Sequence, residues 1–166
     1  MRSQSLLGWI ILGLMLCVSK AIANETLCRK HERVVFSCWL APKTVSLCAT
    51  PTLNATSGRL TYRFGLPGHK PDLIYPAQDK SPASAFTTYF QQWNKGRDRE
   101  VTFKLREHTY TVYNRSAAFE LDERSNGGGV RVSREGKIVT DTWCVDATIE
   151  DNIWDLLHEI GLPETK

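Results

Sequence analysis

Short apolar segments with a two-residue period dominate the chain after residue 28. Leu60, Tyr62 and Phe64, for example, alternate with polar residues. Such alternation is typical of antiparallel strands with one face in the core and the other in water. Turn-forming residues separate the segments at regular intervals, so the pattern predicts an all-β fold, an antiparallel sandwich or a small barrel. The expected strands cover residues 33–39, 44–49, 59–64, 72–75, 85–91, 100–106, 108–114, 117–121, 129–134 and 137–143.

The period changes to three or four residues near the C-terminus. Thr148 precedes this segment, and Asp151 follows three residues later in a spacing that resembles a capping box. We therefore expect one C-terminal amphipathic helix over residues 148–160 that covers an edge or an open end of the sheet. Its apolar positions are Ile149, Ile153, Leu156, Leu157 and Ile160.

The first 23 residues read as a secretory signal peptide. Arg2 precedes an apolar run over residues 6–18, and Ala21-Ile22-Ala23 supplies small residues where a signal peptidase cleaves. A membrane-spanning helix needs about 20 apolar residues, and this run is shorter. We expect cleavage after Ala23. Residues 24–166 would then form a single domain in the periplasm or outside the cell, without further contact with the membrane.

Charge argues against nucleic-acid binding. The full chain carries 21 Lys and Arg against 18 Asp and Glu, and two of the cations, Arg2 and Lys20, lie in the predicted signal peptide. Proteins that bind nucleic acid usually gather a dense basic patch to neutralise several phosphates. We therefore expect no nucleic-acid partner, and we interpret outward residues such as Arg63 and Arg131 as a solvated sheet face.

Four of the five cysteines follow the predicted signal peptide, namely Cys28, Cys38, Cys48 and Cys144. An even number in an exported chain favours two disulfides, which can pair in three ways. Strand alternation places Cys38 on an apolar face and Cys48 on a polar face. This difference favours Cys38–Cys144 and Cys28–Cys48. Because no C-x-x-C or H-x-x-x-H spacing is present, we expect neither a metal site nor a cofactor.

Motifs of catalysis are missing from the sequence. It contains no H-E-x-x-H and no G-x-S-x-G, and His31, His69, His108 and His158 lie among charged or turn residues. We therefore expect a non-catalytic protein. The alternatives are a small envelope hydrolase that uses one of these histidines, and a structural or stress protein of the envelope. The run Asn126-Gly127-Gly128-Gly129 is interpreted as a flexible hairpin turn.

The segment from residue 84 to residue 96 is the best candidate for a binding site. It brings a large aromatic residue and a cation to the tip of a loop between strands, a combination typical of protein-binding surfaces. The alternative is that the aromatic residue packs inward while the cation and the glycine only form the turn. The candidate partner-binding residues are Ser84, Tyr89, Trp93, Lys95 and Gly96.

Several segments together resemble a family of small exported bacterial proteins to which no activity is assigned. The resemblance covers most of the mature chain. It rests on Phe36-Ser37-Cys38, residues 43–48, residues 62–68, residues 72–76, and the final cysteine after Gly136-Lys137.

A shorter match resembles the periplasmic and membrane-bound inhibitors of c-type lysozyme, which are small disulfide-linked β-barrels. Their signature is Ser-Gly-x-x-Tyr followed by Trp-x-Lys-Gly. Here Tyr89 and residues 93–96 match, whereas Ala85-Phe86 stand where that family has serine and glycine. The resemblance implies an exported binding protein that engages a partner, such as a cell-wall hydrolase, through the loop from Tyr89 to Gly96.

Overall fold

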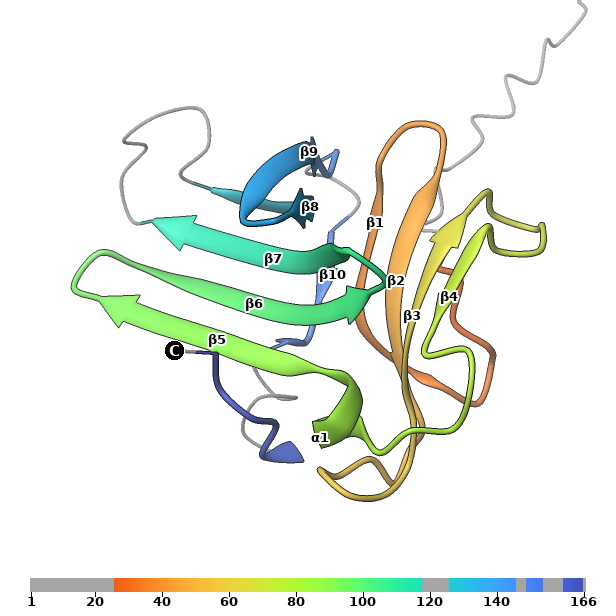
Figure 1. Cartoon of the computed structure of the whole chain (residues 1–166). Coiled ribbons are helices and arrows are strands. Elements are labelled where there is room, and N and C mark those ends of the chain that lie inside the picture. The colour runs from red at the N-terminus through yellow and green to blue at the C-terminus, as the bar shows by residue number, and fades with distance from the viewer. Residues whose placement is uncertain (1–25, 118–125, 146–148, 154–159, 166) are drawn as a thin grey trace, which may run out of the picture.

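Two five-stranded antiparallel sheets form the fold, an all-β sandwich as the alternating pattern predicts. The computed structural model describes residues 26–117, 126–145, 149–153 and 160–165. Sheet A has the strand order β10-β1-β2-β3-β4, and sheet B has the order β5-β6-β7-β8-β9. The strands of the two sheets run at a steep angle to each other, and the β5–β6 and β6–β7 connections lie at opposite ends of sheet B (Figure 1).

The strand bounds follow the predicted segments closely for the first four strands along the chain and less closely in sheet B, and the two-residue strand at Glu150–Asp151 was expected to be helical. Sheet A comprises β1 (Arg33–Trp39), β2 (Thr44–Ala49), β3 (Leu60–Gly65), β4 (Leu73–Tyr75) and β10 (Glu150–Asp151). Sheet B comprises β5 (Thr87–Trp93), β6 (Gly96–Leu105), β7 (His108–Ala117), β8 (Gly127–Arg134) and β9 (Lys137–Trp143). A one-turn helix, α1 (Pro82–Ala85), joins the sheets and was not predicted.

Phe103 on β6 lies at the centre of the core between the sheets. Its ring contacts four other aromatic rings, with centroids 4.2 to 5.7 Å away, from Tyr62, Tyr75, Phe86 and Tyr110. These rings come from β3, β4, β7 and the segment after α1. The alternating apolar positions of both sheets therefore meet at this point, as the two-residue period requires.

Both disulfides have the pairing that strand alternation favours. Cys28 is bonded to Cys48, and Cys38 is bonded to Cys144. Cys38 faces the core beside the aliphatic residues of β2, whereas Cys48 points to the opposite face of sheet A. The second bridge closes a sequence separation of 106 residues and attaches β1 to the chain just after β9.

A short N-terminal segment, residues 26–32, covers the outer face of sheet A. The Leu27 amide donates to Ser46 Oγ at 3.0 Å, and the Cys28–Cys48 bond ties the segment to β2. Arg63 on β3 is consequently buried and forms two bonds to Glu32, from Nη1 to Oε2 at 2.5 Å and from Nη2 to Oε1 at 2.8 Å. The expectation that Arg63 belongs to a solvated face is therefore wrong.

The glycines predicted to form a flexible turn belong to β8 instead. Gly128 and Gly129 are buried and pair with β7. A Cβ at Gly129 would lie 2.6 Å from the Tyr113 hydroxyl oxygen, and one at Gly128 would lie 3.2 Å from the Phe36 ring. These glycines make room for two aromatic rings beside the sheet, which is why a strand position carries no side chain there.

The C-terminal part differs in detail from the expected helix. Glu150 and Asp151 form β10, which pairs with β1, and so do not belong to a first helical turn. Residues 146–148, with the expected capping residue Thr148, and residues 154–159 lie outside the described residues, as do residues 118–125 and the predicted signal peptide. Ile153 and Ile160 are buried in the core. Among the described residues, no helix has the length and apolar character needed to cross a membrane.

The last described residues protect an edge of sheet B. The Thr88 amide donates to the Pro163 carbonyl at 2.8 Å, and the Thr165 amide donates to the Thr88 carbonyl at 2.7 Å. The C-terminal segment thus extends sheet B beside the start of β5 by one parallel bridge. Natural sheets commonly cover an exposed edge in this way.

Candidate functional site

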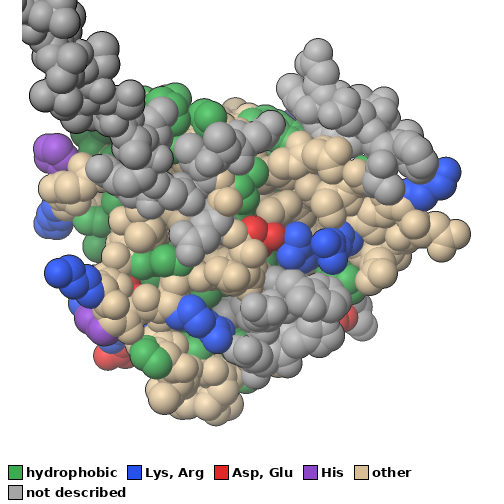
Figure 2. All heavy atoms as spheres, turned by 180° about the vertical axis from the view of Figure 1, so that it is seen from behind, with side chains coloured by type: hydrophobic (Ala, Val, Ile, Leu, Met, Phe, Trp, Pro, Cys, Tyr) green, Lys and Arg blue, Asp and Glu red, His purple; other side chains and the backbone are tan. Residues whose placement is uncertain are grey.

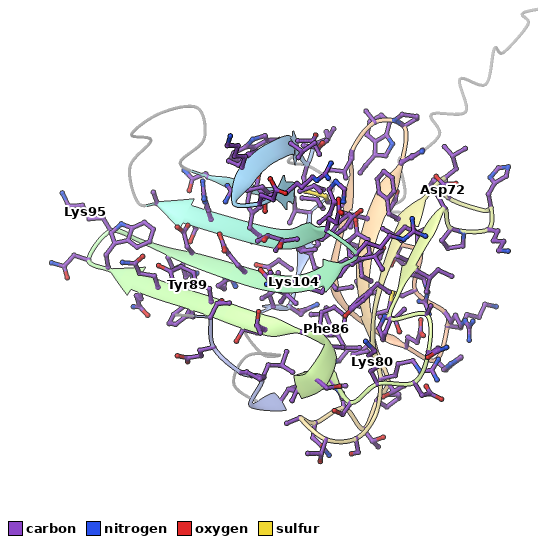
Figure 3. The ribbon with its side chains drawn as sticks, viewed as in Figure 1. Asp72, Lys80, Phe86, Tyr89, Lys95 and Lys104 are labelled. Atoms are coloured by element: carbon purple, nitrogen blue, oxygen red, sulfur yellow. A yellow bond between two sulfur atoms is a disulfide. The ribbon has the colours of Figure 1, made fainter. Side chains whose placement is uncertain are left out.

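The β5–β6 hairpin carries most of the predicted binding residues at its tip. The two strands pair continuously from Thr87 opposite Thr102 to Trp93 opposite Gly96, so only Asn94 and Lys95 remain for the turn. Lys95 lies at the end of the hairpin, on the side of sheet B away from sheet A (Figure 3). The pairing of β5 with β6 thereby holds an aromatic residue and a cation at a projecting end of the molecule.

Trp93 lies on the surface of this hairpin and does not join the core. The side chain is 39% exposed, and a Cβ at Gly96 would lie 2.5 Å from Trp93 Cζ2. The indole therefore rests directly on the Gly96 backbone. Gly96 has a structural reason to be glycine, because any larger residue would displace the indole.

A shallow depression of about 370 Å³ adjoins the indole. Trp93, Lys95, Arg97 and Ser116 contribute to its wall, and Arg97 Nε donates to Ser116 Oγ at 3.1 Å. Tyr89 precedes Trp93 in β5 and donates its hydroxyl hydrogen to Gln91 Oε1 at 2.5 Å. The hairpin tip, meaning residues 91–97, therefore combines an aromatic side chain with the cations Lys95 and Arg97, whereas Tyr89 lies nearer the middle of β5 (Figure 3).

Ser84 does not belong to this surface. It lies in α1, where its hydroxyl donates to the Ser81 carbonyl at 2.8 Å. It lines a different cavity of about 400 Å³ beside Tyr75 and Phe86. Because seven strand residues of about 3.3 Å rise each separate the two ends of β5, roughly 20 Å lies between Ser84 and the hairpin tip.

A polar cluster that sequence reasoning missed occupies the outer face of sheet B around Tyr113. The Tyr113 hydroxyl donates to Asp141 Oδ1 at 2.7 Å, and the guanidinium groups of Arg115 and Arg131 lie 5.2 and 5.1 Å from the centre of its ring. Arg131 Nη1 also lies 3.9 Å from Glu100 Oε1. We call these five residues the Tyr113 cluster.

Burial shifts the pKa values of two groups in this cluster. It raises the pKa of Glu100, and the positive charges of Arg131 and Arg115 oppose that rise only in part. Burial and the hydrogen bond to Asp141 also raise the pKa of the Tyr113 hydroxyl, which therefore stays protonated at neutral pH. A protonated phenol that donates to a carboxylate holds two strands together, and it offers no activated nucleophile.

The histidines of the described residues lack catalytic partners. His69 Nδ1 contacts the Pro67 carbonyl, and His31 and His108 line separate cavities. Within residues 26–117, 126–145, 149–153 and 160–165, no hydrogen bond joins His31 or His108 to a hydroxyl or carboxylate side chain. His158 lies outside the described residues. The described part of the chain thus contains no arrangement of the Ser-His-Asp type.

One cluster of potential metal ligands is accounted for by the disulfide. Cys28, Glu32 and Cys48 lie close together, but both sulfur atoms are bonded to each other and cannot act as thiolate ligands. On the face shown in Figure 2, Lys and Arg side chains lie in several separate groups, with hydrophobic and uncharged polar residues between them. The visible charge on this face is distributed and does not form one continuous basic patch.

The two disulfides are consistent with an oxidising location outside the cytoplasm. Comparisons of the chain with family models, curated proteins and solved structures found no match. The function must therefore be argued from the geometry of this molecule.

Proposed function

We propose that this chain is an exported, non-catalytic binding protein whose hairpin tip inserts into an acidic cleft of a partner protein, such as a cell-wall hydrolase. The observation that carries the proposal is the projecting position of the half-exposed Trp93 beside Lys95. Aromatic residues flanked by cations are frequent energetic centres of protein interfaces. A two-residue turn between paired strands also presents them in a preorganised form, which reduces the entropy lost on binding.

Charge complementarity favours a glycoside hydrolase as the partner. Such enzymes place two carboxyl groups on either side of the bond they cleave. Lys95 and Arg97 bring positive charge to the depression at the hairpin tip, so they would attract a cleft of this kind and speed association at low salt. The resemblance of Tyr89 and residues 93–96 to inhibitors of c-type lysozyme points to the same class of partner.

Inhibition of lysozymes tests the proposal directly. The purified, disulfide-oxidised protein is expected to inhibit a c-type lysozyme, and Lys95→Ala and Trp93→Ala are each expected to raise the half-inhibitory concentration at least tenfold. Lys104→Ala and Leu66→Ala are the matched controls. Lys104 is an exposed lysine away from the tip (Figure 3), and Leu66 at 40% exposure is as accessible as Trp93. Absence of inhibition of c-, g- and i-type lysozymes at micromolar protein would overturn the proposal.

Export forms a separate part of the proposal. Cleavage after Ala23 would deliver a protein that begins at Asn24 to the periplasm or the medium. N-terminal sequencing of the protein from periplasmic and extracellular fractions tests this. An intact N-terminus, or a protein found only in the cytoplasm with reduced cysteines, contradicts export.

A further inference from the structure

A polar cavity of about 530 Å³ opens on the outer face of sheet A, beside the N-terminal segment. The N-terminal segment supplies Arg29, His31 and the acidic Glu32 to its wall, and β3 and the residue before it supply Arg59, Thr61 and Arg63. We call this cavity the basic pocket. Its volume lies within the range of about 300 to 1,000 Å³ that small-molecule sites occupy.

More positively than negatively charged side chains line the basic pocket. Arg29, Arg59 and Arg63 face Glu32 as the one acidic lining residue of the described chain. Arg63 is held in place by Glu32, whereas within the described part of the chain Arg59 pairs only with Asp79, whose side chain is highly exposed. The Arg29 guanidinium forms no ion pair among the described residues, although the Arg29 amide donates to Glu32 Oε2 at 2.7 Å and the charge of Arg29 also lowers the pKa of Glu32. Since an exposed ion pair is worth at most about 1 kcal/mol, a ligand anion can replace Asp79 at Arg59 at small cost.

The floor of the pocket also contains an unused polar group. Thr61 is buried, and its hydroxyl has no hydrogen-bond partner among the described residues. Buried hydroxyl groups are rarely left without a partner, because the lost hydrogen bond to water is not replaced. A polar ligand atom that enters the pocket beside Thr61 would satisfy this requirement after a small adjustment of the hydroxyl.

An apolar cavity adjoins the basic pocket across the edge strand β4. Ile74 and Ala77 line both cavities, and the second one, of about 750 Å³, is also lined by Leu73, Leu105 and Tyr110. We call it the apolar groove. Ile74 is 39% exposed at the boundary between the two cavities. The polar residues Arg106, Glu107 and His108 complete the groove at the β6–β7 turn.

We infer that the basic pocket and the apolar groove together bind a single-chain amphiphile with an anionic head group, a carboxylate or a phosphate monoester. The head group lies at Arg59 and Arg29, since guanidinium groups bind such anions through paired hydrogen bonds. The aliphatic tail passes over Ile74 and Ala77 into the groove, and its burial there removes apolar surface from water on both molecules. This site lies on sheet A and is independent of the proposed hairpin function.

Calorimetric titration of the purified, disulfide-oxidised protein tests the inference. The probes are dodecyl phosphate and dodecanoate, each kept below its critical micelle concentration. We expect micromolar dissociation constants for both. Dodecyltrimethylammonium, with an equal tail and the opposite charge, and inorganic phosphate, with no tail, are each expected to bind at least tenfold more weakly.

Two variants separate the head-group site from the tail site. Arg59→Gln is expected to weaken dodecyl phosphate binding about tenfold, and Ile74→Asn is expected to remove the preference for dodecyl over octyl phosphate. Lys104→Gln and Ile138→Asn are the controls, because both residues are exposed and line neither cavity. Thermal unfolding of each variant confirms that the fold is retained.

Three results would overturn the inference. The first is equal binding of the cationic and anionic amphiphiles. The second is equal affinity of Arg59→Gln, Ile74→Asn and the controls for dodecyl phosphate. The third is binding to vesicles of anionic phospholipid without any binding of the monomeric probes, since adsorption to a charged surface needs no pocket.

Discussion

Replacing Glu32 by Gln tests how much the covered face of sheet A contributes to stability. Glu32 and Arg63 are only 6% and 7% exposed in their side chains, and two short hydrogen bonds join them. The variant would leave the Arg63 guanidinium buried without a negative partner. Removing one member of a buried ion pair typically costs about 3–5 kcal/mol, because the remaining charge is neither paired nor hydrated.

The matched control is Glu107→Gln. Glu107 pairs with Arg134 at the same 2.5 Å separation, but the two side chains are 67% and 51% exposed. Exposed pairs contribute about 0–1 kcal/mol, since water and salt screen them. Urea unfolding at neutral pH is therefore expected to show a loss of about 3–5 kcal/mol for Glu32→Gln and less than about 1 kcal/mol for the control.

The pH dependence of stability gives an independent check on the same pair. Burial alone would raise the pKa of Glu32, but hydrogen bonds from Arg63 and from the Arg29 amide lower it below its ordinary value of 4.5. Ionised Glu32 therefore stabilises the folded state above about pH 4.5, and this contribution disappears as the pH falls through the lowered folded-state pKa. Wild type and Glu32→Gln should converge in acid. Equal losses for Glu32→Gln and Glu107→Gln at neutral pH would refute the reasoning.

Three further substitutions address the core and the outer face of sheet B. Phe103→Ala should lower the free energy of unfolding by about 3–5 kcal/mol in urea titration, and a loss below about 1 kcal/mol would contradict a central role for this ring. Gly129→Ala should cost about 1–3 kcal/mol and change the near-ultraviolet circular dichroism, because its Cβ would meet the Thr142 carbonyl oxygen and the Tyr113 ring; an unchanged spectrum and stability would argue against these contacts. Glu100→Gln should stabilise the protein at pH 7, because burial raises the pKa of Glu100 and its ionisation therefore disfavours the folded state; the gain should vanish in acid, and a destabilised variant would show that the attraction of Arg131 outweighs burial.

Much of the fold was predictable because the alternating pattern carries the necessary information. In a strand, the parity of a position decides its face, so the opposite faces of Cys38 and Cys48 followed from their apolar neighbours. The strand bounds of β1, β2 and β9 followed from the same alternation. Because parity turns Cys38 toward the core, it can bond to Cys144 just after β9 and so join the two sheets.

The covered outer faces were not predictable by this method. Alternation separates an apolar face from a polar one, but it cannot tell whether a distant segment later covers the polar face. Sheet A did carry a signal, since Ser37, Ser46 and Thr61 are small, whereas a solvated face usually presents long charged side chains. The burial of Tyr113 among charged residues left no comparable trace, because its neighbours come from separate strands.

The candidate binding surface was predictable only in part. Trp93, Lys95 and Gly96 come together because a tight hairpin brings consecutive residues to one tip. Ser84 was grouped with them on sequence proximity. It lies apart because β5, which separates it from the hairpin tip, is fully extended at about 3.3 Å per residue.

The order of the disulfides along the chain has a consequence for oxidation. The first cysteine pairs with the third and the second with the fourth, so the two bridges interleave. A chain that is oxidised from its N-terminus onward first joins the neighbours Cys28 and Cys38, which is a non-native bond. The Cys48 thiolate must then attack the Cys28 sulfur, forming the native bond and releasing Cys38 as a thiolate that can be oxidised with Cys144. Oxidation from the N-terminus therefore reaches the native pairing only through one rearrangement, which the chain's own Cys48 thiolate can carry out.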